Sequence, residues 1–119
     1  MDKRIAFLTK QMLSNLRHSP TIEQMACLVN LSESHLQQLF KRELGISPIQ
    51  YLRSLRLEKA RELLEESFMR VQEIGWTIGI SDKSHFVHDF KKEFGATPSE
   101  HRKQHWKKIE DEESKSNES

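Results

Sequence analysis

Two segments of this 119-residue chain carry similar sets of hydrogen-bonding and basic side chains in the same order. The first runs from Ser34 to Arg42 and the second from Lys83 to Lys92. Glutamine amides can make paired hydrogen bonds to N6 and N7 of adenine, and lysine and arginine can neutralise phosphate oxygens without reading sequence. These residue types therefore support recognition of a polyanion that also exposes base edges.

A helix through either segment would bury an apolar stripe and turn its polar side chains outward. The stripe would consist of Leu36, Leu39, Phe40 and Leu44 in the first segment and of Phe86, Phe90 and Phe94 in the second. The outward residues expected to contact bases are Ser34, Gln37, Gln38, Ser84, His85 and His88. Those expected to contact phosphates are His35, Lys41, Arg42, Lys83, Lys91 and Lys92. A solvated helix face can carry the same mix, and His85 could instead pack at the edge of the core.

The two segments belong to an internal repeat, which constrains the architecture more than any single motif does. Ser34 to Gly45 matches Ser84 to Gly95 at an offset of 50 residues. Upstream, the apolar positions of residues 22–29 match those of residues 71–78 at an offset of 49 residues. The difference indicates that one extra residue has entered the turn of the second copy.

Each copy is expected to form a short helix, a turn and a second helix, over about residues 21–45 and 70–95. Ala26 and Gly75 are small residues that would let another helix approach closely. In the turns, Asn30 and Gly79 tolerate positive φ, and Ser32 and Ser81 can cap the helix that follows. Gly45 and Gly95 are placed to end the second helices in the left-handed conformation. This order of elements predicts two tandem helix-turn-helix units.

A long helix is predicted between the copies, over about residues 48–66. Ser47, Pro48 and Gln50 form an N-cap, a proline at the first helical position and a capping-box partner. We expect one apolar stripe comprising Ile49, Leu52, Leu57, Ala60, Leu63 and Leu64, with Leu55 on its flank and Arg53, Arg56 and Lys59 elsewhere. At 1.5 Å per residue the helix would span roughly 25–30 Å, a little under one turn of DNA.

Two further helices complete an expected all-α domain of about seven helices over residues 1–109. One would cover residues 4–17, and the other would begin at the cap formed by Thr97 to Glu100 and run toward Lys108. Residues 1–109 hold 18 lysines and arginines against 13 aspartates and glutamates, a net charge of +5. We name residues 110–119, with five acidic residues and one lysine, the acidic tail, and predict that it is disordered.

The composition excludes several classes of protein and site. A single cysteine, Cys27, rules out an internal disulfide and multi-cysteine metal sites, and its apolar neighbours suggest an inert place in the core. A signal peptide and a membrane-spanning apolar run are both lacking, so a cytoplasmic location is expected. His101 and His105 are four residues apart, but no third ligand is evident, so we predict no metal site. No nucleophile with a base, pair of carboxylates or phosphate-binding glycine loop occurs at usable spacing, so we also predict no cofactor and no catalytic residue. Trp76 could pack under the second unit or donate its indole N–H to a phosphate.

Residues 21–102 resemble the DNA-binding domain of AraC/XylS-type transcription regulators. The matching positions are Glu73, Ile74, Gly79, Ser81, Ser84, Phe86, Phe90, Lys91, Lys92, Gly95, Thr97, Pro98 and Arg102. The sequence departs from the family pattern at Ile80, where an aromatic residue is usual, at His88, where arginine is frequent, and at His101, where tyrosine is usual. These departures concern the identity of the second half-site rather than the fold.

The resemblance implies a seven-helix domain that reads double-stranded DNA as a monomer through two tandem units. It also implies a bacterial-type regulator, usually an activator that recruits RNA polymerase and often carries an N-terminal effector or dimerisation domain. This chain shows no such domain, so it would be either a stand-alone regulator or the DNA-binding part of a longer one. The alternative is a helical protein-interaction module that does not bind DNA.

Overall fold

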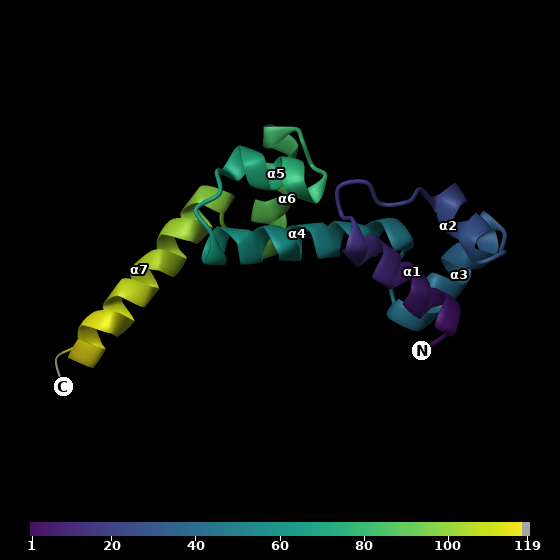
Figure 1. The fold of residues 1–119 in the computed structure, drawn as a ribbon, viewed down its shortest axis with the longest axis horizontal. Coiled ribbons are helices and arrows are strands. Elements are labelled where there is room, and N and C mark those ends of the chain that lie inside the picture. The colour runs from purple at the N-terminus through teal and green to yellow at the C-terminus, as the bar shows by residue number, and fades with distance from the viewer. Residues whose placement is uncertain (118–119) are drawn as a thin grey trace. The chain divides into compact units, whose positions relative to one another are not determined.

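The computed structural model describes residues 1–117, and these residues form seven helices and no strand (Figure 1). The helices are α1 (Lys3–Ser14), α2 (Ile22–Leu28), α3 (Glu33–Leu44), α4 (Pro48–Glu66), α5 (Val71–Ile78), α6 (Lys83–Phe94) and α7 (Pro98–Asn117). The predicted all-α fold, with two helix-turn-helix units and a long helix between them, is confirmed. None of these seven helices is both long enough and apolar enough to cross a membrane.

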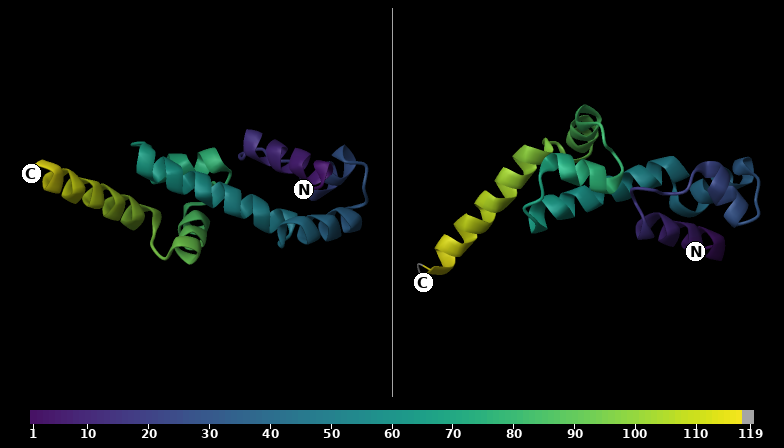
Figure 2. Two further views of the ribbon diagram at one scale, coloured as in Figure 1. Left: turned by 90° about the horizontal axis from the view of Figure 1, so that it is seen from below. Right: turned by 45° about the horizontal axis from the view of Figure 1, so that its top comes forward.

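The chain divides into two compact units, Met1–Arg56 and Leu57–Ser119, which we call unit 1 and unit 2. The boundary falls inside α4, which is one continuous helix (Figure 2). The first part of α4 belongs to unit 1 and the second part to unit 2. Each unit therefore contains four helical segments, and α4 contributes one segment to each.

Unit 1 folds around an apolar core that α1, α2 and α3 supply. Its buried members are Ile5, Leu8, Met12, Met25, Ala26, Leu36, Leu39 and Phe40. Spacings of three and four residues along a helix bring such side chains onto one face. From the start of α4, Tyr51, Leu52 and Leu55 pack against this core, and the Phe40 and Tyr51 rings meet edge to face with 5.5 Å between centroids.

Unit 2 repeats this arrangement around a second core. Its buried members are Leu57, Ala60, Leu64, Ile74, Ile78, Ile80, Phe86 and Phe90. The Arg102 guanidinium of α7 donates hydrogen bonds to the carbonyl oxygens of Leu64 at 3.1 Å and Ser67 at 3.2 Å. These carbonyls lie at the C-terminal end of α4, where helical partners are lacking, so Arg102 satisfies them and holds α7 in place.

The structural repeat is longer than the one found in the sequence. Three buried residues of α1 correspond to three buried residues of α4 at an offset of 52 residues: Ile5 to Leu57, Leu8 to Ala60 and Met12 to Leu64. At the other end of the units, Tyr51 corresponds to His101, and His101 meets Phe90 edge to face at 5.6 Å. The α1 correspondence escaped sequence analysis because it preserves burial and not residue type.

The second helix of each helix-turn-helix begins at a capping side chain. The Ser32 hydroxyl accepts a hydrogen bond from the His35 amide at 3.1 Å, as predicted. In unit 2 the Asp82 carboxylate accepts from the His85 amide at 2.9 Å, so the prediction that Ser81 caps this helix is wrong. The extra residue in the second turn explains the difference, because it moves the cap one position along the chain.

The boundaries of α1 and α7 differ from those expected. α1 ends at Ser14 and not near Arg17, because the Asn15 side chain accepts a hydrogen bond from the His18 amide and forms a local turn. α7 continues to Asn117 and not only to Lys108. It contains many lysines and glutamates and no glycine or proline after Pro98, which favours continued helix. The predicted disorder is therefore wrong for residues 110–117, and residues 118–119 lie outside the described part.

Two apolar positions are not buried as expected. Ile49 is 59% exposed, because it lies roughly 115° round α4 from the mean direction of the Tyr51, Leu52 and Leu55 side chains. Cys27 is exposed and does not fill the core. The apolar residues of α4 thus form two shorter sets, one for each core, and not a single stripe.

Candidate nucleic-acid interface

All of the predicted contact residues of unit 1 lie on the exposed face of α3. They are Ser34, His35, Gln37, Gln38, Lys41 and Arg42. On the opposite face Leu36 and Phe40 are fully buried, and this packing fixes the rotation of α3 about its axis. Gln38 lies near the middle of the exposed face because it is about 160–200° from the two buried residues.

The corresponding residues of α6 are also exposed. Ser84, His85 and His88 face solvent together with Lys83, Lys91 and Lys92, while Phe86 and Phe90 are buried beneath them. His88 occupies the position that corresponds to Gln38, at an offset of 50 residues. The two units therefore present side chains of hydrogen-bonding and basic character at equivalent places.

The turn between the two helices of each motif begins with the same backbone hydrogen bond in both units. The Leu31 amide donates to the Ala26 carbonyl at 2.9 Å, and the Ile80 amide donates to the Gly75 carbonyl at 2.8 Å. A Cβ atom at Gly75 would lie only 2.8 Å from the Ile80 carbonyl oxygen and 3.1 Å from the Phe86 ring. Glycine thus lets α6 pack closely against α5, as predicted for this small residue.

The residues that follow α2, α3, α5 and α6 have the positive φ values expected of them. Asn30 and Gly79 have positive φ values of 56° and 90°, which turn the chain between the paired helices. Gly45 and Gly95 have φ values of 82° and 81° and end α3 and α6. The ends of both exposed helices are therefore set by glycines that the sequence identified.

Basic side chains lie at the C-terminal ends of both exposed helices, Lys41 and Arg42 on α3 and Lys91 and Lys92 on α6. Cations are favourable there because the helix dipole places partial negative charge at that end. Within the described residues, no salt bridge engages these four side chains or Lys83. Their charges are thus available to phosphates.

One residue at this surface was missed by sequence analysis. The Asp89 carboxylate lies between two predicted contact residues, 2.9 Å from Nε2 of His85 and 3.4 Å from Nδ1 of His88. Its side chain is only 11% exposed, whereas those of His85 and His88 are 62% and 75% exposed. The separation of four residues between His85 and Asp89 is the signal that would have indicated this contact.

Trp76 and Cys27 occupy equivalent positions, at an offset of 49 residues, on the outer sides of α5 and α2. Trp76 is 53% exposed, so the expectation that it packs under unit 2 is only half met. It lines a shallow surface hollow with Met69, Arg70, Gln72, Glu73 and Thr77, and Cys27 lines another with Pro20, Gln24 and Leu28. The alternative, that the Trp76 indole N–H donates to a phosphate, stays a prediction.

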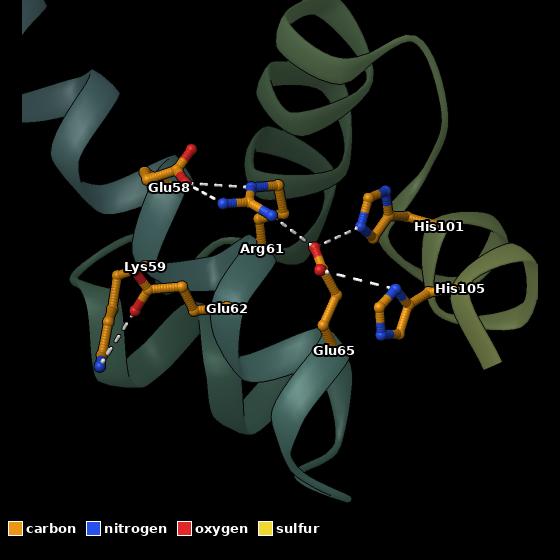
Figure 3. Close-up of polar contacts among 7 residues, drawn as sticks. All are labelled: Glu58, Lys59, Arg61, Glu62, Glu65, His101 and His105. Atoms are coloured by element: carbon orange, nitrogen blue, oxygen red, sulfur yellow. Dashed lines mark hydrogen bonds and ion pairs between the residues drawn. The ribbon is translucent and has the colours of Figure 1, made fainter. Parts of the chain in front are cut away.

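A second polar cluster lies within unit 2, away from the exposed face of α6. Figure 3 shows Glu65 of α4 facing His101 and His105 of α7, with Glu65 oxygens 3.0 Å from His101 Nε2 and 3.5 Å from His105 Nδ1. Arg61 contacts the same carboxylate at 2.7 Å. Partial burial raises the pKa of Glu65, but the hydrogen bonds from His101 and Arg61 and the charges of Arg61 and His105 outweigh this effect, and the pKa is lowered.

These contacts give the two histidines of α7 a structural role. Their separation of four residues suits a carboxylate on a neighbouring helix, which both rings reach. Among the described residues, no group of three or more histidine, cysteine, aspartate or glutamate side chains could hold a metal ion.

Comparison with protein families and curated relatives identifies related sequences. A family model described as a helix-turn-helix domain matches residues 25–104. The RCS-specific HTH-type transcriptional activator RclR of Escherichia coli is 32% identical over 102 residues, covering 86% of this chain and 36% of the relative. The lactose operon transcription activator of Staphylococcus xylosus is 36% identical over 89 residues, covering 75% and 32%. The chain thus spans about a third of the length of the curated relatives it matches.

Solved structures show the same fold. An AraC-type transcriptional regulator from Chromobacterium violaceum is 31% identical and superposes with a TM-score of 0.80, covering 86% of this chain and 91% of that one. The C-terminal domain of AraT, a response regulator from Geobacillus stearothermophilus, is 30% identical with a TM-score of 0.81, covering 87% and 86%. The DNA-binding domain of AdpA, solved with a target DNA, has a TM-score of 0.81 at 23% identity, covering 87% and 93%, and supports the fold alone.

Proposed function

This chain belongs to the AraC-type family of helix-turn-helix transcription regulators, and on that premise we propose that α3 and α6 are recognition helices that enter two successive major grooves of double-stranded DNA. The observation that carries the proposal is the matched exposure of α3 and α6. Each helix buries its apolar stripe and presents serine, histidine and lysine at equivalent positions, with Gln38 of one matched by His88 of the other.

The contact residues fall into two groups by their chemistry. Ser34, Gln37 and Gln38 of α3 and Ser84, His85 and His88 of α6 read base edges, because their side chains can donate or accept single or paired hydrogen bonds. The residues that hold phosphates are His35, Lys41, Arg42, Lys83, Lys91 and Lys92, and they set the position of the helices.

The broader role is that of a cytoplasmic transcription regulator without catalytic activity. Two relatives are named as activators, which supports a role in activation. We infer that this activation involves contact with RNA polymerase. The relatives are about three times as long as the matched region, which supports a partner domain for effector binding or dimerisation in proteins of this kind.

Selection from a random pool of duplexes at fixed salt tests the proposal. We expect two short conserved blocks about 10 base pairs apart, in tandem orientation, because the two units are a direct repeat within one chain. Uniformly palindromic sites would contradict the tandem arrangement, since they would require a dimer twofold axis.

The alternative function, a helical module that binds proteins and not DNA, predicts a different salt dependence. Several phosphate contacts make log affinity fall steeply and linearly with log salt concentration. An exposed helix face that docks on a protein shows no such slope for DNA, and no sequence would be enriched in the selection. A flat salt response together with an unenriched pool would favour the alternative.

A further inference from the structure

The Asp89 carboxylate is the least expected feature of α6. It corresponds to Leu39 of α3, which is 2% exposed and part of the core of unit 1. A mostly buried carboxylate costs free energy unless hydrogen bonds compensate for its lost hydration. Both of its oxygens are used, Oδ2 by His85 and Oδ1 by His88. Unit 2 has therefore exchanged a packing residue for one whose partners are two predicted base-contacting residues.

The contact determines which ring nitrogen of His88 carries the proton. An ionised carboxylate can only accept hydrogen bonds, so Nδ1 of His88 must be the donor toward Asp89. In the neutral ring, Nε2 is then left as an acceptor, and the His88 side chain is 75% exposed. In the protonated ring, Nε2 becomes a donor. Without Asp89 the neutral ring would be free to adopt either tautomer.

We propose that Asp89 is a positioning residue that makes His88 a proton-dependent reader of one base in the block bound by unit 2. The inference rests on the proposed DNA-binding function. When the ring is protonated, Nε2–H donates to O6 or N7 of guanine. When it is neutral, Nε2 accepts from the exocyclic amino group of cytosine or adenine. The base that unit 2 prefers therefore changes when the His88 ring gains a proton.

The charged groups on neighbouring helices have other partners. On α5, Glu73 pairs with Arg70. On α4, Arg61 contacts Glu58 and Glu65, and on α7 both histidines contact Glu65. On α6 itself, the nearby cations Lys91 and Lys92 are in none of the salt bridges of the described residues. The proton-dependent unit therefore consists of Asp89 and its two histidines.

Binding measurements at two pH values test the proposal. The probes are duplexes bearing the selected site, with each of the four bases in turn at every position of the second block, at pH 6 and pH 8 and constant salt. We expect the wild type to favour guanine at one position by about tenfold more at pH 6 than at pH 8. Preferences in the first block, which unit 1 reads, should not change.

Variants separate positioning from packing. Asp89→Leu restores the residue that α3 carries at this position, so it should fold, retain specific binding and lose the change in base preference with pH. Asp89→Asn provides a second version of similar size, and His88→Gln should bind with a preference that does not depend on pH. A wild-type preference that is the same at both pH values, or an Asp89→Leu variant that shifts as the wild type does, would overturn the proposal.

The imidazole nitrogens give a readout that does not require DNA. At pH 8, nitrogen NMR of the free protein should show His88 as the Nδ1–H tautomer, and Asp89→Leu should convert it to a mixture. His35 is the matched control, because the residue four positions after it is Leu39 and it should not respond. An unchanged His88 tautomer would also overturn the proposal. Absence of specific binding by every version, with the tautomer as expected, would instead contradict the proposed function.

Discussion

At the scale of single residues, the repeat places pairs of residues at equivalent positions on α3 and α6. Gln38 and His88 occupy equivalent places on α3 and α6, and so do Lys41 and Lys91. A residue that reads a base should affect one position of the DNA site. A residue that holds a phosphate should affect all sequences alike. Substitutions at equivalent positions can therefore separate the two roles without any change of protein background.

Replacing Gln37 and Gln38 by alanine should remove base discrimination in one block. We expect a loss of about 1–3 kcal/mol of binding free energy at the selected site, because a bidentate contact to adenine is lost. Competition between duplexes that differ at single positions measures the effect. The block bound by unit 2 should keep its preferences, and an equal loss at both blocks would contradict separate reading by the two units.

Replacing Lys91 or Lys41 by alanine should weaken binding to every sequence by a similar factor. Loss of one phosphate contact reduces the slope of log affinity against log salt by about 0.9. Affinities measured at four or more salt concentrations give this slope. A suitable control is Lys10→Ala on α1, outside both predicted interfaces, whose slope should equal that of the wild type. An altered base preference in the Lys91 variant would show that this side chain reads sequence.

At the scale of helices, capping residues decide where the recognition helices begin. Asp82 and not Ser81 satisfies the first turn of α6. Replacing Asp82 by alanine should lower the free energy of unfolding by about 1 kcal/mol, because the His85 amide loses its acceptor. Ser81→Ala is the matched control and should change stability little. Urea unfolding measures the stability of both variants. A larger loss of stability in Ser81→Ala than in Asp82→Ala would contradict the assignment of Asp82 as the cap.

The contact between Glu65 and α7 should make the free energy of unfolding depend on pH. A carboxyl group whose pKa is lowered on folding stabilises the protein above its unfolded pKa of about 4.3, and this contribution is lost as the pH falls through the folded value. Glu65→Gln should therefore cost on the order of 1 kcal/mol at pH 6, and the difference from wild type should disappear as the pH falls through the lowered pKa of Glu65.

Denaturant unfolding at several pH values measures this difference. Glu62→Gln is the control, since Glu62 pairs with Lys59 at 3.5 Å and both side chains are close to half exposed (Figure 3). An exposed pair of this kind contributes little to stability. Equal effects of the two substitutions at pH 6 would argue against a specific role for Glu65.

Most of the helices could be predicted from sequence, because local signals define them. Proline and capping residues mark where α4 begins, and glycine in the left-handed conformation marks where α3 and α6 end. The errors arose where a neighbouring residue competes for the same role, as at Ser81 and Asp82. They also arose where burial depends on tertiary contacts, as at Ile49 and Cys27. Periodicity gives the apolar face of a helix but not which core each part of that face joins.

The residues predicted to form the interface are exposed in the structure, but the prediction did not include Asp89. Every predicted contact residue is exposed, since apolar stripes on α3 and α6 determine the outward face. Asp89 was overlooked because an acidic residue is unfavourable near phosphates when considered alone. Its position between two histidines becomes evident only when side-chain geometry is known.

At the scale of the whole molecule, charge is distributed unevenly along the chain. Residues 110–119 carry five acidic residues against one lysine, while residues 1–109 have a net charge of +5. In the structure, residues 110–115 extend α7 and their side chains are exposed. This part of the molecule therefore contributes electrostatically more than it contributes to either core.

Removing the chain from Asp111 onward should leave the fold intact and modestly strengthen nonspecific DNA binding. Residues 111–115 are exposed, and their net negative charge repels phosphates. A thermal melt and a salt titration of the shortened protein test the two expectations. A control in which the acidic residues from Asp111 onward become glutamine or asparagine keeps the length and removes the charge. Unfolding of the shortened protein would show that the acidic tail has a structural role.

The correspondence between α4 and α7 shows how a tandem array is terminated. α4 closes unit 1 and then supplies Leu57, Ala60 and Leu64 to the core of unit 2, so the same helix both ends one unit and begins the next. At the offset of 50 residues, α7 carries Lys107, Glu110 and Ser114 at those three places, all exposed. A further unit stacked on α7 would find charged and polar groups where its core should begin. α7 thus ends the repeat with a polar surface, as terminal capping helices do in repeat proteins.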